Sequence, residues 1–257
     1  MPMLGIGTAG AKGDACVVAV HEALQVGYRL IDTASMYGNE REVGIAVRES
    51  GLPREEIFVT TKIATPEQGP RSTPKALDES LRRLGLDYVD LYLIHWPSRR
   101  KRLATWEAMI PLVERGLARS IGVSNFMVRH LEELQTVEET PAVNQIELSP
   151  FLQQEEVVGY CREHGIHLEA YSPLTRGRRL NDLVIARIAA KYGKTPAQVL
   201  VRWSLQHGFI AIPKSVRPER IRENADVFDF ALSTSDVRAL DALEQGLHFD
   251  WDSSRVP

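Results

Sequence analysis

Cysteine is scarce in this sequence, and no stretch of it has the pattern expected of a leader or of a membrane span. The 257 residues include two cysteines, Cys16 and Cys161, with neither CxxC spacing nor a nearby histidine cluster. We therefore expect two reduced thiols in a cytoplasmic protein, with no disulfide and no metal site. The start, MPMLGIGTAGAKG, lacks the charged and then apolar run of a signal peptide. No apolar run approaches the roughly 18 residues that a membrane span requires, so we predict no membrane partner.

Charge of one sign is not concentrated anywhere, and no glycine-rich phosphate loop follows a strand. The net charge is −3, with acidic and basic residues mixed along the chain. Without a basic block, we predict no nucleic-acid partner. The GIGTAG at 5–10 has the wrong spacing for a dinucleotide loop and does not end a buried strand within a dinucleotide unit. This absence disfavours an open, doubly wound sheet.

Short β-branched runs recur along the chain, and a helical pattern follows each of them. The runs cover 5–8, 29–34, 57–63, 89–95, 119–125, 142–148, 167–173 and 209–215. Between them, apolar residues recur at three- and four-residue spacing, which is typical of amphipathic helices. Strands separated by single helices pair in parallel, and eight such units in about 250 residues match a closed (β/α)₈ barrel. No linker interrupts the pattern, so residues 1–257 are predicted to form a single α/β domain.

The helical segments depart from strict alternation in two places. The gap between the seventh and eighth strands has room for two helices, at 181–192 and 196–207, and a further helix is predicted at 234–245. Thr195-Pro196 and Thr73-Pro74 are each interpreted as an N-cap followed by proline in the first helical turn.

Polar residues of three adjacent strands and one loop come together at the predicted strand ends. The second strand ends at Asp32, with Tyr37 in the loop beyond it; the third ends near Lys62, and the fourth at His95. In a barrel of this kind, chemistry is located where the strands end. A buried lysine is costly unless it is paired, and Asp32 is the available partner.

The same four residues indicate acid–base chemistry on an oxygen. A phenol has a pKa of about 10, and a nearby ammonium is expected to lower the pKa of Tyr37. A tuned tyrosine can protonate a developing alkoxide, and His95 can hydrogen-bond the same oxygen. The alternatives remain a structural Asp32–Lys62 ion pair and a core histidine.

The eighth unit indicates a phosphate site. Its sequence IPKSVRPERIREN runs from a strand into a helix with Pro218 in the first turn, and it carries Lys214, Ser215, Arg217 and Arg220. A helix N-terminus with basic side chains binds phosphate readily, and barrels often bind phosphate after strands seven and eight. The alternative is a solvated basic helix face, which explains Arg222 well. Tyr171, at the end of the seventh strand, can stack on a flat ring or serve as a core aromatic.

Taken together, these motifs resemble those of the aldo-keto reductases over nearly the whole chain. The shared segments are GYRLIDTASMYGNE, VTTKI, LDYVDLYLIHWP, RSIGVSNF, PAVNQIEL, EAYSPL and IPKSVRPERIREN. The chain is most similar to the bacterial branch that includes 2,5-diketo-D-gluconate reductases. The resemblance implies NADPH-dependent reduction of aldehydes and ketones to alcohols, with keto-sugars as one candidate class of substrate. It also suggests a monomer.

The resemblance implies a role for each matching residue. Tyr37 would be the general acid, assisted by Lys62 and Asp32, with His95 orienting the carbonyl; a small-molecule carbonyl substrate would lie against Tyr37, His95 and Trp96. Ser124, Asn125 and Gln145 would hold the nicotinamide carboxamide, and Tyr171 would stack beneath the ring. The adenosine 2′-phosphate would meet Lys214, Ser215, Arg217 and Arg220, with Glu223 and Asn224 near the adenine. The remaining expected cofactor contacts are Gly7, Thr8, Asp32, Ser172, Pro173, Leu174, Ile212, Pro213 and Val216.

The sequence departs from the family pattern outside the four acid–base residues. It starts almost at the first barrel strand, so the N-terminal hairpin of the family is expected to be largely missing. Ala9, and Ile63 with Ala64, stand where bulkier or aromatic residues are common, which predicts a wide and less aromatic substrate pocket.

Two other functions remain open. One is a nucleotide-sensing regulatory subunit built on the same fold, which would bind NADPH with little turnover. The other is a barrel hydrolase that uses Glu147 and Glu169 as a carboxylate pair on adjacent strands.

Overall fold

Eight parallel strands lie side by side in the order in which they occur in the chain, in a computed structural model that describes residues 1–256. The strands are β1 (Ile6–Gly7), β2 (Leu30–Asp32), β3 (Phe58–Ile63), β4 (Val89–Ile94), β5 (Ala118–Ser124), β6 (Val143–Glu147), β7 (His167–Tyr171) and β8 (Ile210–Ala211). Parallel bridges join Leu4 to Ala211 and Gly7 to Lys214, which closes β8 onto β1. The predicted (β/α)₈ barrel is therefore confirmed.

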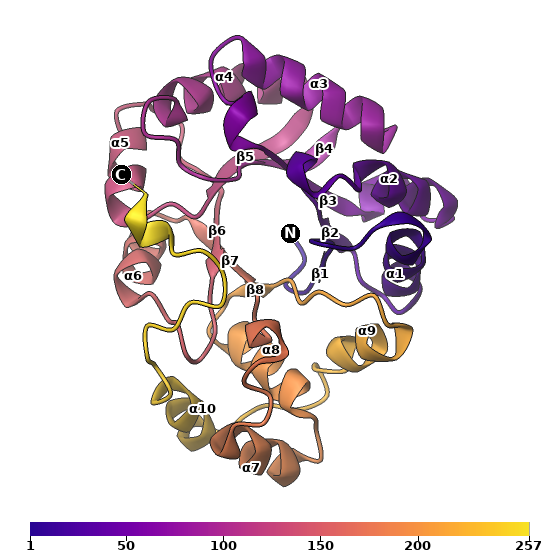
Figure 1. Ribbon diagram of the computed structural model, residues 1–257, viewed down its shortest axis with the longest axis vertical. Helices are drawn as coiled ribbons and strands as arrows, with labels where there is room; N and C mark the ends of the chain where they lie inside the picture. The colour runs from indigo at the N-terminus through magenta and orange to yellow at the C-terminus, as the bar shows by residue number, and fades with distance from the viewer. Residues whose placement is uncertain (257) are drawn as a thin grey trace.

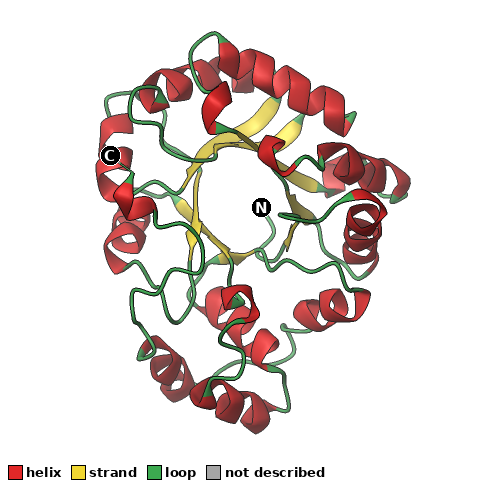
Figure 2. Ribbon diagram, in the orientation of Figure 1, coloured by secondary structure: helices red, strands yellow, loops and turns green. Residues whose placement is uncertain are grey.

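Helices surround the ring of strands (Figures 1 and 2). They are α1 (Gly13–Gln25), α2 (Glu40–Glu49), α3 (Ser72–Leu84), α4 (Arg102–Glu114), α5 (Val128–Leu134), α6 (Glu155–Glu163), α7 (Leu183–Tyr192), α8 (Pro196–Gln206), α9 (Pro218–Ala225) and α10 (Thr234–Asp241). Both helices predicted between the last two strands are present as α7 and α8, and the expected C-terminal helix is α10. Within residues 1–256, every helix is too short or too polar to cross a bilayer.

The two cap predictions had different outcomes. Thr195 caps α8 as expected: its hydroxyl accepts a hydrogen bond from the backbone N–H of Gln198, whose side chain accepts from the Thr195 N–H. The cap predicted at Thr73 is wrong, because α3 begins one residue earlier and the Thr73 hydroxyl donates to Gly69 O at 2.7 Å. The flanking loop, rather than the Thr-Pro pair, sets this helix start.

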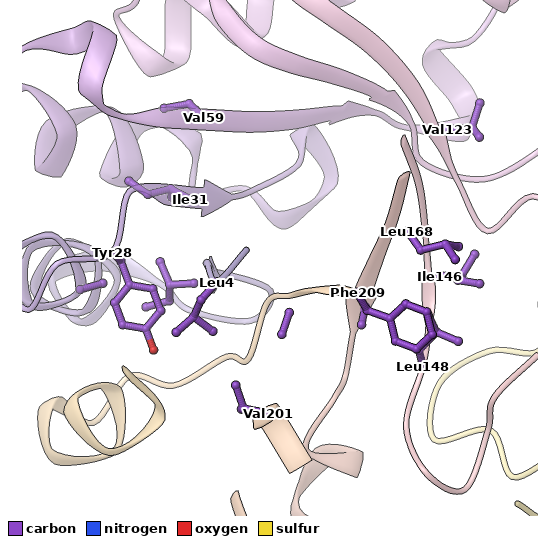
Figure 3. Packing of buried hydrophobic residues seen from close by; sticks show 14 of the residues in the cluster. Leu4, Tyr28, Ile31, Val59, Val123, Ile146, Leu148, Leu168, Val201 and Phe209 are labelled. Carbon is purple, nitrogen blue, oxygen red and sulfur yellow. The ribbon is translucent and has the colours of Figure 1, made fainter. Parts of the chain in front are cut away.

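The alternation of side chains along each strand separates the core from the barrel interior. Ile31, Val123, Ile146 and Leu168 lie in the large apolar cluster that packs strands against helices (Figure 3). Successive strand residues point to opposite faces, so their neighbours Asp32, Ser124, Gln145 and Glu169 face inward. Two small apolar clusters also lie in the interior, formed by Leu30, Ile210 and Ile212 and by Leu91, Leu93 and Val143. The barrel interior therefore holds both polar and apolar residues.

Helices α2 and α3 pack so closely that one position permits no side chain. A Cβ at Gly44 of α2 would lie 1.8 Å from the backbone oxygen of Leu84. Gly44→Ala should therefore lower the free energy of unfolding by more than about 3 kcal/mol, measured by chemical denaturation. Gly159→Ala in α6 is the matched control, because a Cβ there meets nothing within 4 Å; it should raise stability by about 0.5–1 kcal/mol. Equal effects of the two substitutions would contradict the packing.

Candidate active site

A buried ion pair joins β2 and β3 at the mouth of the barrel. Lys62 Nζ lies 2.6 Å from Asp32 Oδ1, and the two side chains are 0% and 2% exposed. The ammonium also donates to the backbone oxygen of Thr33 at 2.9 Å. Burial lowers the pKa of Lys62, but the charges of Asp32 and Tyr37 and the hydrogen bond to Asp32 outweigh burial and raise it above its usual value. Lys62 is therefore a fixed cation inside the protein.

Tyr37 lies beside this ammonium, at the end of the short helix η1 (Ser35–Tyr37) that follows β2. Lys62 Nζ is 3.4 Å from the Tyr37 hydroxyl. The loop is held from both sides: the Ser35 hydroxyl donates to Glu67 at 2.7 Å, and the Asn39 amide donates to the backbone oxygen of Thr8 at 2.8 Å. The hydroxyl is thus placed by a fixed backbone.

The expected lowering of the Tyr37 pKa is wrong in its net direction. Burial raises the pKa of Tyr37, and the opposing effect of the Lys62 charge is smaller. Tyr37 is consequently a protonated phenol with a cation beside its oxygen. Such a group is arranged to release its proton when a stronger base, such as a developing alkoxide, arrives.

His95 follows β4 and faces the Tyr37 ring edge-on, with ring centroids 5.5 Å apart. The ring is buried, and its Nδ1 has no hydrogen-bond partner among residues 1–256. Burial, with the Lys62 charge as a second cause, lowers the pKa of His95 to about 3. The imidazole is neutral at physiological pH, and so it can donate a hydrogen bond without adding charge.

Below the ion pair, Gln145 connects Asp32 to a second acid. Its Nε2 donates to Asp32 Oδ2 at 2.8 Å and to Glu169 Oε2 at 2.7 Å. Glu169 is fully buried, and burial together with the Asp32 charge raises its pKa to about 8. Gln145 was predicted to contact a cofactor, whereas no sequence pattern indicated its contact with Glu169.

The ends of β5, β6 and β7 meet at Asn125. The Asn125 side-chain amide donates to the backbone oxygen of His95 at 3.0 Å, and its oxygen accepts from the Tyr171 hydroxyl at 2.8 Å. The Ser124 hydroxyl donates to the backbone oxygen of Gln145 at 2.9 Å. The predicted carboxamide residues and the predicted stacking tyrosine therefore lie together, next to the four acid–base residues.

Where β8 meets β1, the backbones approach closely. Gly7 N donates to Pro213 O at 3.1 Å, and a Cβ on Gly7 would lie 3.0 Å from Ile212 O. The Thr8 hydroxyl donates to the backbone oxygen of Asp32 at 2.9 Å. These predicted cofactor residues thus lie between the ion pair and the eighth unit, and a Cβ at Gly7 would press on the backbone at Ile212.

The basic residues of the eighth unit surround the start of α9, where Pro218 occupies the first turn as predicted. Lys214, Arg217 and Arg220 are exposed and have no ion-pair partner within residues 1–256. The Ser215 hydroxyl accepts from the backbone N–H of Arg217 at 3.1 Å, and Val216 packs against the core. These free cations at a helix N-terminus fit a phosphate group.

Three other residues of α9 are engaged with the protein itself. Arg222, interpreted as a surface residue, pairs with Glu22 of α1 at 2.6 Å. Glu223 accepts from the Thr195 hydroxyl at 2.6 Å, and Asn224 is buried. The structure thus gives the two residues expected near an adenine a place in the packing of α9.

The loop after β7 and the C-terminal tail meet above the barrel. The loop carries Ser172, Pro173 and Leu174, and Ser172 is one of three non-glycine residues there with positive φ, at 50°. The Ser172 hydroxyl donates to Asp250 of the tail at 3.3 Å. The strained backbone brings the loop against the tail, which no local sequence signal indicated.

Glu147 and Trp96 hold the tail at the barrel mouth. Both Glu147 oxygens accept backbone N–H groups of the tail, from Phe249 at 2.9 Å and Asp250 at 3.2 Å. Trp251 packs on Trp96, which directly follows His95 in the sequence, and their ring centroids are 4.8 Å apart. The tail therefore adds an aromatic side chain, Trp251, beside the site. The prediction of a less aromatic pocket did not take this side chain into account.

Comparisons with known proteins agree with this arrangement. The profile described as Aldo/keto reductase family matches residues 3–245. The glyoxal reductase of Bacillus subtilis (strain 168) is 49% identical over 247 residues, covering 95% of this chain and 90% of that protein. An aldo-keto reductase of Mycolicibacterium vanbaalenii is 51% identical over 252 residues, covering 97% and 90%.

Solved structures show the same likeness over the whole barrel. An aldo-keto reductase from a Medee basin deep-sea metagenome library superposes with a TM-score of 0.97 at 43% identity, covering 100% of this chain and 96% of that one. An aldo/keto reductase from Brucella melitensis gives a TM-score of 0.92 at 49% identity, covering 95% of each chain. On its sequence and its fold alike, this chain belongs to the aldo/keto reductase family, a family of oxidoreductases.

Proposed function

We propose that this protein is an NADPH-dependent reductase that converts aldehydes and ketones into alcohols, with Tyr37 as the general acid. The observation that carries the proposal is the placement of a protonated phenol, a buried ammonium and a neutral imidazole around one point at the barrel mouth. These groups suit the protonation of a carbonyl oxygen as it becomes an alkoxide.

NADPH, when bound, supplies the hydride to the carbonyl carbon. The phenolic proton of Tyr37 passes to the carbonyl oxygen, which completes the alcohol. Lys62, 3.4 Å from the phenolic oxygen, stabilises the phenolate that remains, and Asp32 holds Lys62 in place. His95 donates a hydrogen bond to the same carbonyl oxygen and orients it. The acid is then restored by uptake of a proton.

The residues of the barrel rim fit the cofactor. Ser124, Asn125 and Gln145 would hold the carboxamide, and the Tyr171 ring would stack on the nicotinamide. Lys214, Arg217 and Arg220 would bind the 2′-phosphate with Ser215, which favours NADPH over NADH. The Gln145 side-chain oxygen has no protein donor among residues 1–256, so it is free to accept from an amide.

For the substrate we propose broad chemical classes rather than a single compound. The name of the Bacillus subtilis relative suggests glyoxal and similar small aldehydes, and the resemblance to 2,5-diketo-D-gluconate reductases suggests keto-sugars. We further propose a monomer that works in the cytoplasm, which suits its two buried, unpaired cysteines.

Replacement of Tyr37 tests the chemistry. Tyr37→Phe should lower kcat by roughly 10²–10⁴-fold because the proton donor is lost, while the NADPH Kd changes little. The kcat is measured from NADPH consumption with glyoxal, other aldehydes, ketones and keto-sugars. The Kd of NADPH is measured by fluorescence titration. Tyr88→Phe is the control, because Tyr88 lies next to the opposite end of β4. Retained turnover in Tyr37→Phe would refute the role. NADPH binding by the unsubstituted protein without consumption would instead indicate a sensing subunit.

The basic residues of α9 test the choice of cofactor. Arg220→Ala should weaken NADPH binding by about tenfold or more, since it removes a charged hydrogen bond to the 2′-phosphate, and should leave NADH binding unchanged. Arg222→Ala is the matched control on the same helix, because Arg222 already pairs with Glu22. Titration of each variant with both cofactors gives the answer. Equal losses for NADPH and NADH would show that Arg220 does not read the phosphate.

The charge of His95 is a third test. Its pKa of about 3 means that the ring stays neutral as the pH falls from about 8 to about 5. Nitrogen-detected NMR should therefore show no protonation of His95 in that range, with its signals assigned from their loss in His95→Gln. A titration midpoint near the usual value of about 6.5 would mean that the site carries a second cation.

A further inference from the structure

The amide of Gln145 is held between two carboxyl groups. Gln145 and Glu169 are register partners on β6 and β7, and Asp32 reaches the same amide from β2. The Nε2 atom donates to both acids, at 2.8 Å and 2.7 Å, so both of its N–H groups are used. The amide oxygen therefore points away from the two acids.

The two acids also select this orientation of the amide. If the amide turned over, its oxygen would face Oδ2 of the ion-paired Asp32, which can only accept, and the N–H groups that now bind the two acids would lose those partners. An unsatisfied buried polar group is expensive, so the reversed orientation is disfavoured. Asp32 is already bound to Lys62 at 2.6 Å. Glu169 has no such partner, since its Oε1 is buried without a hydrogen bond in the described part of the chain.

The charge of Glu169 depends on its surroundings. It is fully buried, and burial followed by the Asp32 charge raises its pKa to about 8, although the Gln145 hydrogen bond and Lys62 oppose that rise. Glu169 is thus mainly a neutral acid at pH 7 and an anion above about pH 8. The acid–base roles assigned to Asp32, Tyr37, Lys62 and His95 leave this group unused.

We propose that Glu169 is a positioning residue that acts on the cofactor through Gln145, holding the amide oxygen toward the nicotinamide carboxamide and placing a titratable carboxyl group beneath the ring. This inference rests on the proposed NADPH-dependent function. It also explains why the Gln145 amide has this orientation. The other residues expected to contact the cofactor do not explain it.

A charge under the nicotinamide distinguishes the two forms of the cofactor. The oxidised ring carries a positive charge and the reduced ring does not, so an ionised Glu169 stabilises NADP⁺ relative to NADPH. The ratio of the Kd of NADP⁺ to that of NADPH should therefore fall as the pH rises through about 8. The 2′-phosphate belongs to both forms, and its own titration cancels in the ratio.

Other titratable and charged groups share the barrel interior with Glu169. They are Asp32 on β2, Lys62 on β3, His95 after β4, Glu147 on β6, Tyr171 on β7 and Tyr37 in η1. The pKa values of Lys62, Tyr37 and Tyr171 are raised above their usual values, and that of His95 is lowered to about 3. All of these groups are unchanged in Glu169→Gln, so the difference between that variant and the unsubstituted protein isolates Glu169.

The experiment measures both Kd values by titration calorimetry from about pH 6 to about pH 9, on the full chain. In the unsubstituted protein the ratio should fall at least about threefold. Glu169→Gln keeps an acceptor for Gln145, so its NADPH affinity at pH 7 should be nearly unchanged and its ratio should not vary with pH. Glu169→Leu removes the acceptor, and its NADPH affinity should fall roughly tenfold.

Leu93→Ala is the matched control for a loss of packing. Leu93 lies in one of the small apolar clusters of the interior and carries no polar group, so its replacement should lower stability while the pH dependence of the ratio stays as in the unsubstituted protein. The proposal is overturned if Glu169→Gln keeps that pH dependence, or if Glu169→Leu binds NADPH normally. The first comparison decides even if Glu169→Leu does not fold.

The outcomes separate this inference from the proposed function. If the unsubstituted protein binds neither form of the cofactor, the proposed function fails and the inference fails with it. If the protein binds both forms and consumes NADPH, but Glu169→Gln behaves identically over the whole pH range, the inference alone is wrong.

Discussion

The buried pair of Lys62 and Asp32 is the constraint around which the mouth of the barrel is built. Removing two charges from water costs several kcal/mol per ion, and the attraction between them offsets that cost only when the remaining hydrogen-bonding groups are satisfied. Here the ammonium has the Thr33 carbonyl, and the carboxylate has the Gln145 amide. Thr33 directly follows β2, and Gln145 lies on β6, so the ion pair determines what the ends of separate strands must supply.

The regular geometry of the closed barrel brings the hydrogen-bonding partners of the ion pair together. Side chains alternate between the two faces of a strand, and parallel strands end at the same edge, so polar residues at strand ends converge without any local motif. This explains why the positions of Asp32, Lys62 and His95 could be predicted from the sequence. The same reasoning is weaker at irregular edges: the eighth strand was predicted over 209–215, whereas its regular part is Ile210–Ala211.

Contacts between distant segments, and balances between opposed effects, could not be predicted. Glu147 binds the backbone of a tail 102 residues later in the sequence, and nothing in either segment marks the other. The pKa of Tyr37 illustrates the second limit. The sequence identified the ammonium that lowers it, but only the depth of burial shows that desolvation is the larger effect. The failed cap at Thr73 has a local origin, because α3 begins at Ser72, so that Thr73 lies inside the helix and its hydroxyl donates to Gly69 O.

The two glutamates that suggested a hydrolase have different structural roles in this barrel. Glu147 binds two backbone N–H groups of the tail, which carries Trp251 to Trp96, whereas Glu169 binds the amide that also holds Asp32. A hydrolytic pair would need both carboxyl groups free to face one bond, and here each is committed to a different neighbour. One acid thus holds the tail at the barrel mouth, and the other belongs to the polar interior. Because these supports are separate, the tail is held at the barrel mouth by contacts that do not involve the ion pair.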